Sequence, residues 1–359
     1  MSTGQPAARG YGIASIPGDG IGVEVTAEAR RVLDTAAGRF GFELRWEEFD
    51  YGCERYRRTG ELMPADGIDR LAGHDAILLG AVGYPGVPDH VSLWGLLIPI
   101  RRAFDQYVNL RPVRLLPGVT SPLAGRDAKD LDMVVVRENS EGEYSQIGGR
   151  HRPGTPDEFV LQESVFTRAG IERIARFAMD LARTRRGVVC SATKSNGLVH
   201  SMPFWDEVVA EVAADYPDVT VEKCHVDALA ARMVLNPDRL DVIVGSNLFG
   251  DILSDLAAAV VGGLGTAPSG NLNPDRTRPS MFEAVHGSAP DIAGAGIANP
   301  VAQILTGAML LDHLGEGAAA RAVGDAVDTV LASGPRTPDL GGSATTTQVG
   351  SAVCDALTG

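Results

Sequence analysis

Short apolar runs alternate with longer amphipathic segments along almost the whole chain, and this alternation constrains the fold more than any other feature. The strand-like runs are Gly12–Pro17, Ala76–Val82, Met133–Arg137, Val188–Ala192, Val219–Val226 and Val242–Gly245. The helix-like segments between several of them are Gly22–Ala37, Ala169–Thr184, Pro203–Ala214 and Asp227–Leu235. A repeated strand–helix–strand order predicts an α/β protein with a mostly parallel sheet.

Composition narrows the class of protein. The chain has 359 residues, a length that predicts two lobes or one large α/β unit. Hydrophobic residues make up 44% of the chain, enough to form a core. The net charge of −14 disfavours a nucleic-acid partner, which would need a basic surface. No apolar stretch is long enough to predict a membrane span.

The N-terminal segment and the cysteines bear on location. Residues 1–12 show no basic region followed by an apolar stretch, so we expect a short flexible tail and no secretory signal. The four cysteines are scattered, without a CxxC pair. Both features favour a cytoplasmic protein with reduced thiols.

Two further segments carry structural expectations. Residues 142–160 are rich in glycine, proline and polar side chains, which favours a protruding loop or arm and a contact between subunits. Asn299–Leu314 is apolar at helical spacing and almost uncharged, so we expect a buried helix, packed against the chain's own core rather than a partner.

The motif NLFGDILSD, Asn247–Asp255, directly follows the strand-like run that ends at Gly245. A strand ending there would deliver the motif to the carboxyl edge of the sheet, where ligand sites of α/β proteins lie. Asp251 and Asp255 are four residues apart, so on a helix they share one face and repel each other unless a cation lies between them. Carboxylate oxygens suit Mg²⁺ or Mn²⁺, and this interpretation is favoured over a solvated acidic face.

Other candidate residues stay open from spacing alone. Asp227, at a strand-to-helix junction, is a third metal ligand or a helix N-cap. Arg101, Arg111 and Arg137 would bind a substrate with more than one carboxylate if they converge, but each alone is typical of a surface arginine. Tyr144 and Lys194 are candidate proton carriers, although a lone tyrosine or lysine in a loop is usually structural.

The sequence motifs neither predict nor exclude a bound nucleotide. Glycines stand at positions 18, 20 and 22 of IPGDGIG, which is not GxGxxG, and the chain has no P-loop motif. The small residues of Glu283–Asn299 would let a ligand approach the backbone, or they form an irregular surface loop.

Taken in order along the chain, these segments match one family. The chain resembles the β-decarboxylating dehydrogenases of isocitrate, 3-isopropylmalate, homoisocitrate and tartrate or D-malate. The matching segments are IPGDGIG, NLRP, VVVREN, ATKSN, NLFGDILSD, EAVHGSAPDIAG and IANP, which together cover most of the chain. The resemblance implies the two-domain α/β fold of isopropylmalate dehydrogenase, with a large, mostly parallel sheet, and not a Rossmann fold. One domain would comprise residues 1–106 and 262–359, and the second, with dimer-interface elements, residues 107–261.

The resemblance also implies roles for individual residues. Arg101, Arg111 and Arg137 match substrate-binding arginines, and Tyr144 and Lys194 match an acid–base pair. Asp227, Asp251 and Asp255 match ligands of Mg²⁺ or Mn²⁺, with Lys194 and Asp227 contributed across the interface of a homodimer; a tetramer is the alternative. A monovalent cation such as K⁺ is a further expected cofactor.

For the dinucleotide, the resemblance implies a binding loop that begins at His286. Asp291 in this loop would accept hydrogen bonds from the ribose hydroxyls and repel a 2′-phosphate, which predicts NAD rather than NADP. Asn299 matches an adenine contact, and Asn196 matches a contact near the nicotinamide. The remaining predicted cofactor-binding residues are Gly287, Ser288 and Ala289.

Substrate choice depends on the segment before Arg101. Leu97 is on the arginine side of this segment, and Trp94 stands where isopropylmalate enzymes have a glutamate. A tryptophan there would fill the space of a C3 substituent, unless it packs outward, and DHVSLWG resembles tartrate and D-malate dehydrogenases in particular. We therefore predict NAD-dependent oxidative decarboxylation of D-malate to pyruvate and CO₂, and oxidation of tartrate. The alternatives are a 3-isopropylmalate dehydrogenase and a non-catalytic regulatory subunit of a related dehydrogenase.

Overall fold

The computed structural model describes residues 9–359, and these fall into two compact units. Unit 1 contains the described residues up to Gln106, Leu115–Thr120 and Gly262–Gly359. Unit 2 contains Tyr107–Arg114 and Ser121–Val261. The predicted N-terminal tail lies mostly outside the described residues, but Arg9 already belongs to the first strand.

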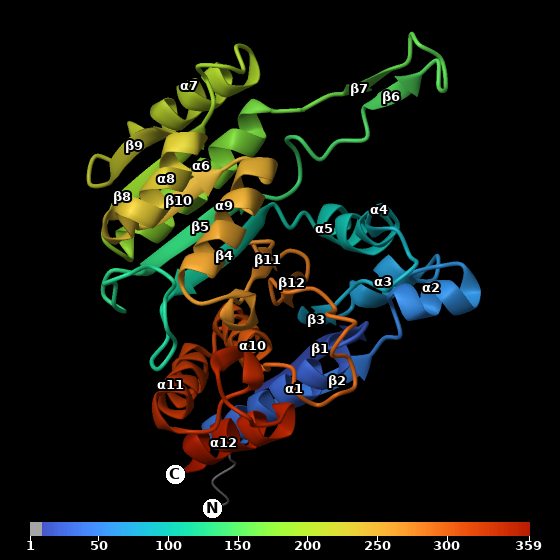
Figure 1. The fold of residues 1–359 in the computed structure, drawn as a ribbon, viewed down its shortest axis with the longest axis vertical. Helices are drawn as coiled ribbons and strands as arrows, with labels where there is room; N and C mark the ends of the chain where they lie inside the picture. The colour runs from blue at the N-terminus through green and yellow to red at the C-terminus, as the bar shows by residue number, and fades with distance from the viewer. Residues whose placement is uncertain (1–8) are drawn as a thin grey trace, which may run out of the picture. The chain divides into compact units, whose positions relative to one another are not determined.

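Unit 1 contributes five strands, in the order β2, β1, β3, β12, β11 (Figure 1). They span Phe42–Glu48 (β2), Arg9–Gly18 (β1), Ala76–Ala81 (β3), Ser280–Glu283 (β12) and Gly270–Leu272 (β11). All neighbours pair in parallel except β11 and β12, which are antiparallel. Every residue of β3 is buried, which is typical of a central parallel strand covered on both faces.

Helices from both ends of the chain cover the strands of unit 1. The long helices are α1 (Gly22–Phe40), α10 (Val301–His313), α11 (Gly317–Ser333) and α12 (Thr346–Thr358), and they pack on one another. The short helices are α2 (Cys53–Thr59), α3 (Gly67–Leu71), α4 (Asp89–Ser92) and α5 (Ile98–Ala103). The helix α10 is buried against α1, α11 and β12, which confirms the prediction that this almost uncharged helix packs within the chain's own core.

Unit 2 contributes the other five strands, in the order β4, β5, β10, β8, β9. They span Val108–Arg114 (β4), Asp132–Glu138 (β5), Val242–Gly245 (β10), Val188–Thr193 (β8) and Thr220–His225 (β9). β4 and β5 are antiparallel, and the other pairs are parallel. The prediction of a large, mostly parallel sheet is therefore confirmed, and the antiparallel pairs β11–β12 and β4–β5 distinguish it from a Rossmann sheet.

Four helices belong to unit 2: α6 (Arg168–Arg183), α7 (Ser201–Ala213), α8 (Val226–Leu235) and α9 (Asn247–Val260). The glycine-rich segment that predicted an arm forms an antiparallel hairpin of β6 (Gly148–His151) and β7 (Phe159–Gln162), which extends away from the rest of this unit (Figure 1). All eight residues of its two strands are exposed. Among the described residues, no helix has the length and apolar character needed to cross a membrane.

Candidate active site

Asp251 is the centre of a cluster of predicted site residues in unit 2. Its Oδ1 lies 2.5 Å from Arg137 Nη1 and 3.4 Å from Arg111 Nη2, and its Oδ2 accepts a hydrogen bond from the Tyr144 hydroxyl at 2.9 Å. The three donors come from β4, β5 and the loop after β5, which bring them to the start of α9. The structure thus brings together one predicted metal ligand, two predicted substrate arginines and the predicted acid.

Asp255 follows one helical turn after Asp251, as the spacing predicts. Arg111 donates to Asp255 Oδ1 at 3.3 Å and to the Ser254 hydroxyl at 2.6 Å, so its guanidinium spans both carboxylates. Burial raises the pKa of Asp255 and the negative charge of Asp251 raises it further, whereas Arg111 opposes both effects. A cation between the two aspartates would remove their repulsion, so this pair of oxygen donors fits a hard divalent ion.

Arg137 is held in place by contacts that the sequence alone did not predict. Its Nε and Nη2 both donate to Asn247 Oδ1, at 3.1 and 2.7 Å, and Asn247 in turn donates to the Glu141 carbonyl at 3.0 Å. A Cβ added at Gly250 would lie 2.6 Å from Arg137 Cβ, so only glycine lets α9 pass this close. Asn247 and Gly250 both lie in the predicted NLFGDILSD motif, but only its aspartates had suggested a function.

Glu143 fixes the start of α9 beside Tyr144. Its Oε1 accepts from the Ser246 hydroxyl at 2.7 Å, and its Oε2 accepts from the backbone N–H of Leu248 at 3.0 Å. A carboxylate at a helix N-terminus satisfies an otherwise unpaired N–H and interacts favourably with the helix dipole. Glu143 therefore holds the loop that carries Tyr144 against the helix that carries Asp251.

Lys194 and Asp227 form a second group in unit 2. Lys194 follows β8 and Asp227 lies in the first turn of α8, and Lys194 Nζ is 2.9 Å from Asp227 Oδ2. The hydrogen bond from Lys194 lowers the pKa of Asp227. The proton carrier and metal ligand that the resemblance assigns to one side of a dimer interface are thus neighbours within one chain.

The three predicted metal ligands do not form one cluster within the described part of this chain. The single group there of three or more potential ligands within 4.8 Å of one another is Cys190, Glu222 and Cys224. Asp251 and Asp255 lie together without Asp227. A site that contains all three carboxylates would therefore need Asp227 from a second copy of the chain. Its assignment as a metal ligand stays a prediction.

Arg101 lies in unit 1, at the end of α5, and is buried. Its Nη2 donates to Glu283 Oε1 at 2.7 Å, and the same oxygen accepts from Asn271 Nδ2 at 2.7 Å. Trp94 and Leu97 lie in a π-helical turn, Leu93–Leu97, that precedes α5, and such turns are frequent at functional sites. Leu97 packs against the hydrophobic core. The Arg102 guanidinium lies over the half-buried Trp94 ring, 5.1 Å from the ring centre. The substrate roles of Arg101, Trp94 and Leu97 stay predictions.

The glycine-rich turn near the N-terminus serves as a structural brace in unit 1. Asp19 is buried, and its carboxylate accepts from the backbone N–H groups of Cys53, Glu54 and Gly83 at 2.9–3.0 Å. A Cβ at Gly20, which has φ of +57°, would lie 2.1 Å from the Ser288 carbonyl oxygen. The turn therefore supports the predicted cofactor loop, a role that its glycine spacing had left ambiguous.

The predicted cofactor loop of unit 1 offers an unpaired polar atom. His286 Nε2 is buried and has no hydrogen-bond partner among the described residues, and burial lowers the pKa of this imidazole, which favours the neutral ring. Ala289 has φ of +38°, an uncommon conformation for a residue with a side chain. Asp291 is exposed, and Asn299 donates to Asp339 Oδ2 at 2.9 Å. A loop with an unsatisfied ring nitrogen and small neighbours fits a dinucleotide; Asp339 was not predicted from the sequence.

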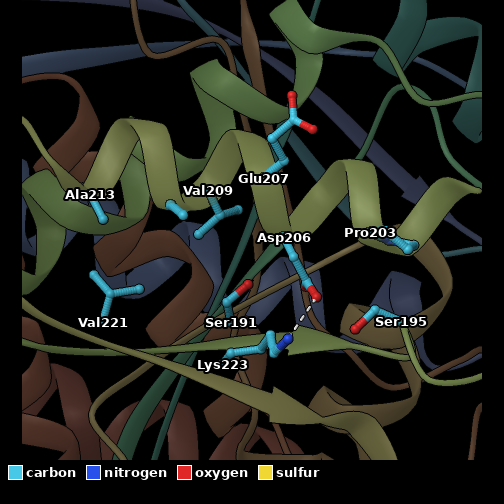
Figure 2. Close-up of a pocket in the computed structure, with 10 residues that line it drawn as sticks. Ser191, Ser195, Pro203, Asp206, Glu207, Val209, Ala213, Val221 and Lys223 are labelled. Atoms are coloured by element: carbon cyan, nitrogen blue, oxygen red, sulfur yellow. Dashed lines mark ion pairs between the residues drawn. The ribbon is translucent and has the colours of Figure 1, made fainter.

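A cavity of about 680 Å³ in unit 2 lies between α7 and the strands β8 and β9 (Figure 2). Asp206 and Lys223 form an ion pair across it at 3.3 Å, and Ser195, next to Lys194, lies at one end. None of the predicted site residues lines this cavity. Asn196 lies in the exposed turn after Lys194, where its predicted nicotinamide contact remains a prediction.

Comparison with known proteins agrees with this arrangement. The model of the isocitrate/isopropylmalate dehydrogenase family matches residues 12–353. The chain is 57% identical to D-malate dehydrogenase [decarboxylating] of Escherichia coli (strain K12) over 95% of this chain and 97% of the relative. It is 54% identical to tartrate dehydrogenase/decarboxylase of Pseudomonas putida over 98% of each chain. The crystal structure of isocitrate dehydrogenase from Methylococcus capsulatus superposes with a TM-score of 0.88 at 36% identity, covering 97% of this chain and all of the other.

The chain belongs to the isocitrate/isopropylmalate dehydrogenase family and is an enzyme of the decarboxylating-dehydrogenase type. The resemblance and the fold inferred from the sequence motifs are both confirmed.

Proposed function

We propose that this enzyme uses NAD and Mg²⁺ or Mn²⁺ to oxidise D-malate at C2 and to release CO₂, giving pyruvate, and that it also oxidises tartrate. The observation that carries the proposal is the convergence of Arg111, Arg137 and Tyr144 on Asp251. Two arginines beside a pair of carboxylates suit a ligand that is both anionic and bound to a cation. The identity of more than 50% with D-malate and tartrate dehydrogenases supports this substrate class.

The residues present fit the metal and the dinucleotide. Asp251 and Asp255 would hold the divalent ion, with Asp227 as the third carboxylate, and the bound ion supplies Lewis-acid polarisation of the substrate's oxygen atoms. The unpaired His286 Nε2 and the exposed Asp291 would face the dinucleotide, which accepts the hydride from C2. A monovalent cation such as K⁺ remains a proposed activator.

Different side chains of this enzyme would bind, deprotonate and protonate the substrate. Arg111 and Arg137 bind carboxylate groups and orient the substrate, and Arg101 is the third proposed carboxylate contact. Lys194 would take the proton of the 2-hydroxyl during oxidation at C2, for which the bound dinucleotide would supply the hydride acceptor. The C4 carboxylate is β to the new carbonyl, so loss of CO₂ from it leaves an enolate, and Tyr144 would donate a proton to its carbon C3 to give the ketone of pyruvate.

The cofactor preference rests on Asp291. A carboxylate at this position accepts hydrogen bonds from ribose hydroxyls and repels the 2′-phosphate of NADP. Asn299, Gly287, Ser288 and Ala289 would line the adenosine side, and Asn196 the nicotinamide side.

We further propose that the enzyme works as a homodimer with shared sites. Lys194 and Asp227 are paired in one chain but are not clustered with Asp251 and Asp255, so a second copy would complete each site. The β6–β7 hairpin exposes Phe159, Val160 and Leu161, and an apolar surface of this kind is suited to a contact between subunits. A tetramer built from such dimers is the alternative.

The segment before Arg101 would set the choice of substrate. Trp94 would limit the space at C3 and so favour a four-carbon diacid over 3-isopropylmalate. The experiment is a side-by-side measurement of NADH formation with D-malate, the tartrate isomers, 3-isopropylmalate and isocitrate, with Mg²⁺ or Mn²⁺ added. The proposal requires D-malate to give the highest kcat/KM or to be equalled only by a tartrate. A preference for 3-isopropylmalate would overturn the Trp94 argument, and no turnover of any of them would indicate a regulatory subunit.

A further inference from the structure

Two cysteines and a glutamate meet on the β8–β9 edge of unit 2, apart from the residues of the proposed active site. One potential ligand atom from each of Cys190, Glu222 and Cys224 lies within 4.8 Å of the others. Cys190 is buried, and Glu222 and Cys224 are partly exposed on β9, the edge strand. A small ion can therefore reach the group from the side of the edge strand.

The register of the two strands explains why these side chains meet. Cys190 pairs with Glu222, and Cys224 follows two residues later on β9, so Glu222 and Cys224 point to the same face of the sheet. Arg232 of α8 contacts both of them, which identifies this face as the one covered by α8. The intervening Lys223 lies on the opposite face, where it lines the cavity beneath α7 (Figure 2).

This geometry disfavours a disulfide between the two cysteines. They occupy diagonal positions on neighbouring parallel strands, where a strand spacing of about 4.8 Å and a rise of about 3.3 Å per residue place the Cα atoms roughly 8 Å apart. A disulfide spans roughly 4.4–6.8 Å. Both strands are fixed in the sheet by backbone hydrogen bonds, so the Cα atoms cannot approach cheaply. A metal ion reaches ligand atoms about 2.0–2.3 Å away on each side, and so bridges a wider gap than a sulfur–sulfur bond does.

We propose that Cys190, Glu222 and Cys224 bind one thiophilic divalent cation, of which Zn²⁺ is the representative, at a site separate from the Mg²⁺ or Mn²⁺ site. Two thiolates and a carboxylate match the sulfur and oxygen donors of zinc sites, and a water molecule would complete four-coordination. Mg²⁺ and Mn²⁺ prefer all-oxygen ligands, so they would not compete for the two sulfurs.

Arg232 completes the charge balance of this site. Two thiolates, one carboxylate and Zn²⁺ carry a net charge of −1, and the guanidinium supplies +1. Arg232 Nη1 lies 2.5 Å from Glu222 Oε2 and 3.7 Å from Cys224 Sγ. A carboxylate can accept from arginine with one oxygen and bind a metal with the other, so Arg232 would act as the orienting partner of a ligand rather than as a competitor.

The protonation of the cysteines is compatible with metal binding. The hydrogen bond from Cys190 lowers the pKa of Cys224, and Arg232 contributes in the same direction. The Cys190 thiol stays protonated without a metal, because this hydrogen bond and burial raise its pKa. A thiol must lose its proton to bind a metal, so binding of the cation would release protons and the affinity for Zn²⁺ would rise with pH.

Titration of the reduced full-length enzyme with Co²⁺, in the presence of excess Mg²⁺, tests the proposal. Thiolate ligands give Co²⁺ a strong near-ultraviolet charge-transfer absorption that carboxylate ligands do not give. We expect this absorption to saturate at one equivalent of Co²⁺ and to disappear when Zn²⁺ is added. No thiolate absorption, or loss of it to Mg²⁺ alone, would overturn the proposal.

Variants assign the ligands. Cys190→Ala and Cys224→Ala are expected to abolish the absorption, and Glu222→Gln to weaken Co²⁺ binding at least tenfold. Cys354→Ala, which removes a partly exposed cysteine of α12, is the matched control and keeps the full signal. Absorption that survives both Cys190→Ala and Cys224→Ala, or that is lost in Cys354→Ala, would contradict the assignment.

A measurement on the wild-type chain covers the case in which a variant fails to fold. Zn²⁺ bound at the site would protect Cys224 from alkylation by iodoacetamide, which mass spectrometry quantifies for each cysteine. We expect at least a tenfold slower modification of Cys224 with Zn²⁺ and an unchanged rate for Cys354. Equal protection of both cysteines, or of neither, would contradict the proposal.

Discussion

The hydroxyl of Tyr144 donates a hydrogen bond to Asp251 Oδ2 at 2.9 Å, so the predicted proton donor and a predicted metal ligand are in direct contact. The Arg137 guanidinium lies over the Tyr144 ring at 5.4 Å and pairs with the other oxygen of the same carboxylate. These contacts fix the phenol next to the place where a carboxylate-bearing substrate would bind.

Tyr144→Phe tests the proton donor. The variant keeps the ring but loses the hydroxyl, so we expect kcat for pyruvate formation to fall about 10²- to 10⁴-fold, with NAD binding unchanged. The control is Tyr11→Phe, which removes a hydroxyl that donates to Glu316 in unit 1 and is expected to leave kcat within twofold. Near-parental kcat in Tyr144→Phe would remove Tyr144 from the mechanism.

Gly250→Ala tests the contacts that hold the Arg137 guanidinium in place. The added Cβ would meet Arg137 Cβ at 2.6 Å and displace the guanidinium from Asn247 and Asp251. A charged hydrogen bond contributes about 1.5–3 kcal/mol, so kcat/KM for D-malate should fall roughly 10- to 100-fold.

The matched control for this variant is Gly324→Ala in α11, where an added Cβ meets no atom of the described residues within 4 Å. This change should leave kcat/KM unaltered and stabilise unit 1 by about 0.5–1 kcal/mol, because alanine favours the helix. If both variants lost kcat/KM to the same degree, the close approach of α9 to Arg137 would not explain the effect.

Asp291→Lys tests the basis of cofactor choice. The variant replaces a charge that repels the 2′-phosphate with one that attracts it, so the ratio of kcat/KM for NADP to that for NAD should rise at least tenfold. Asp325→Lys on the exposed face of α11 changes the net charge equally and should not move the ratio. An unchanged ratio in Asp291→Lys would show that another residue selects the cofactor.

His313 predicts a dependence of stability on pH. Burial and the nearby Arg276 lower the pKa of this imidazole to about 4, and its ring packs against Phe282. The unfolded chain takes up a proton near pH 6.5 whereas the folded chain does not, so stability is lost as pH falls from about 7 toward 4. Between pH 7 and 5 the loss attributable to His313 is about 2 kcal/mol.

Urea unfolding of the wild type and of His313→Gln at pH 7 and pH 5 measures this difference. The free energy of unfolding should fall with pH by about 2 kcal/mol more in the wild type than in the variant, because the glutamine does not titrate. Other histidines contribute equally to both proteins and cancel. Identical pH slopes would show that His313 is not held neutral by its surroundings.

The local parts of the fold could be predicted from the sequence because they depend on periodicity. The spacing of Asp251 and Asp255 correctly predicted two carboxylates one turn apart on a helix, and the almost uncharged segment that ends at Leu314 correctly predicted a buried helix. The ends of elements shifted by a few residues: β1 begins at Arg9 rather than Gly12.

The supporting contacts could not be predicted, because they join residues far apart in the sequence. Arg137 and Asn247 are separated by 110 positions, and Ser246 and Glu143 by 103. A glycine inside a helix, such as Gly250, was a signal available in the sequence. Nothing in the sequence indicated that Arg137 is the neighbour that requires a glycine at position 250.

The most direct test of the central claim is the product balance with D-malate, NAD and Mg²⁺. NADH is followed by absorbance, pyruvate by lactate dehydrogenase after the reaction is stopped, and CO₂ by release from D-malate labelled at C4. Oxidative decarboxylation predicts NADH, pyruvate and CO₂ in equal amounts, with no formation of any of them when the metal is removed by a chelator. NADH formed without pyruvate and CO₂, or at the full rate without metal, would contradict the account.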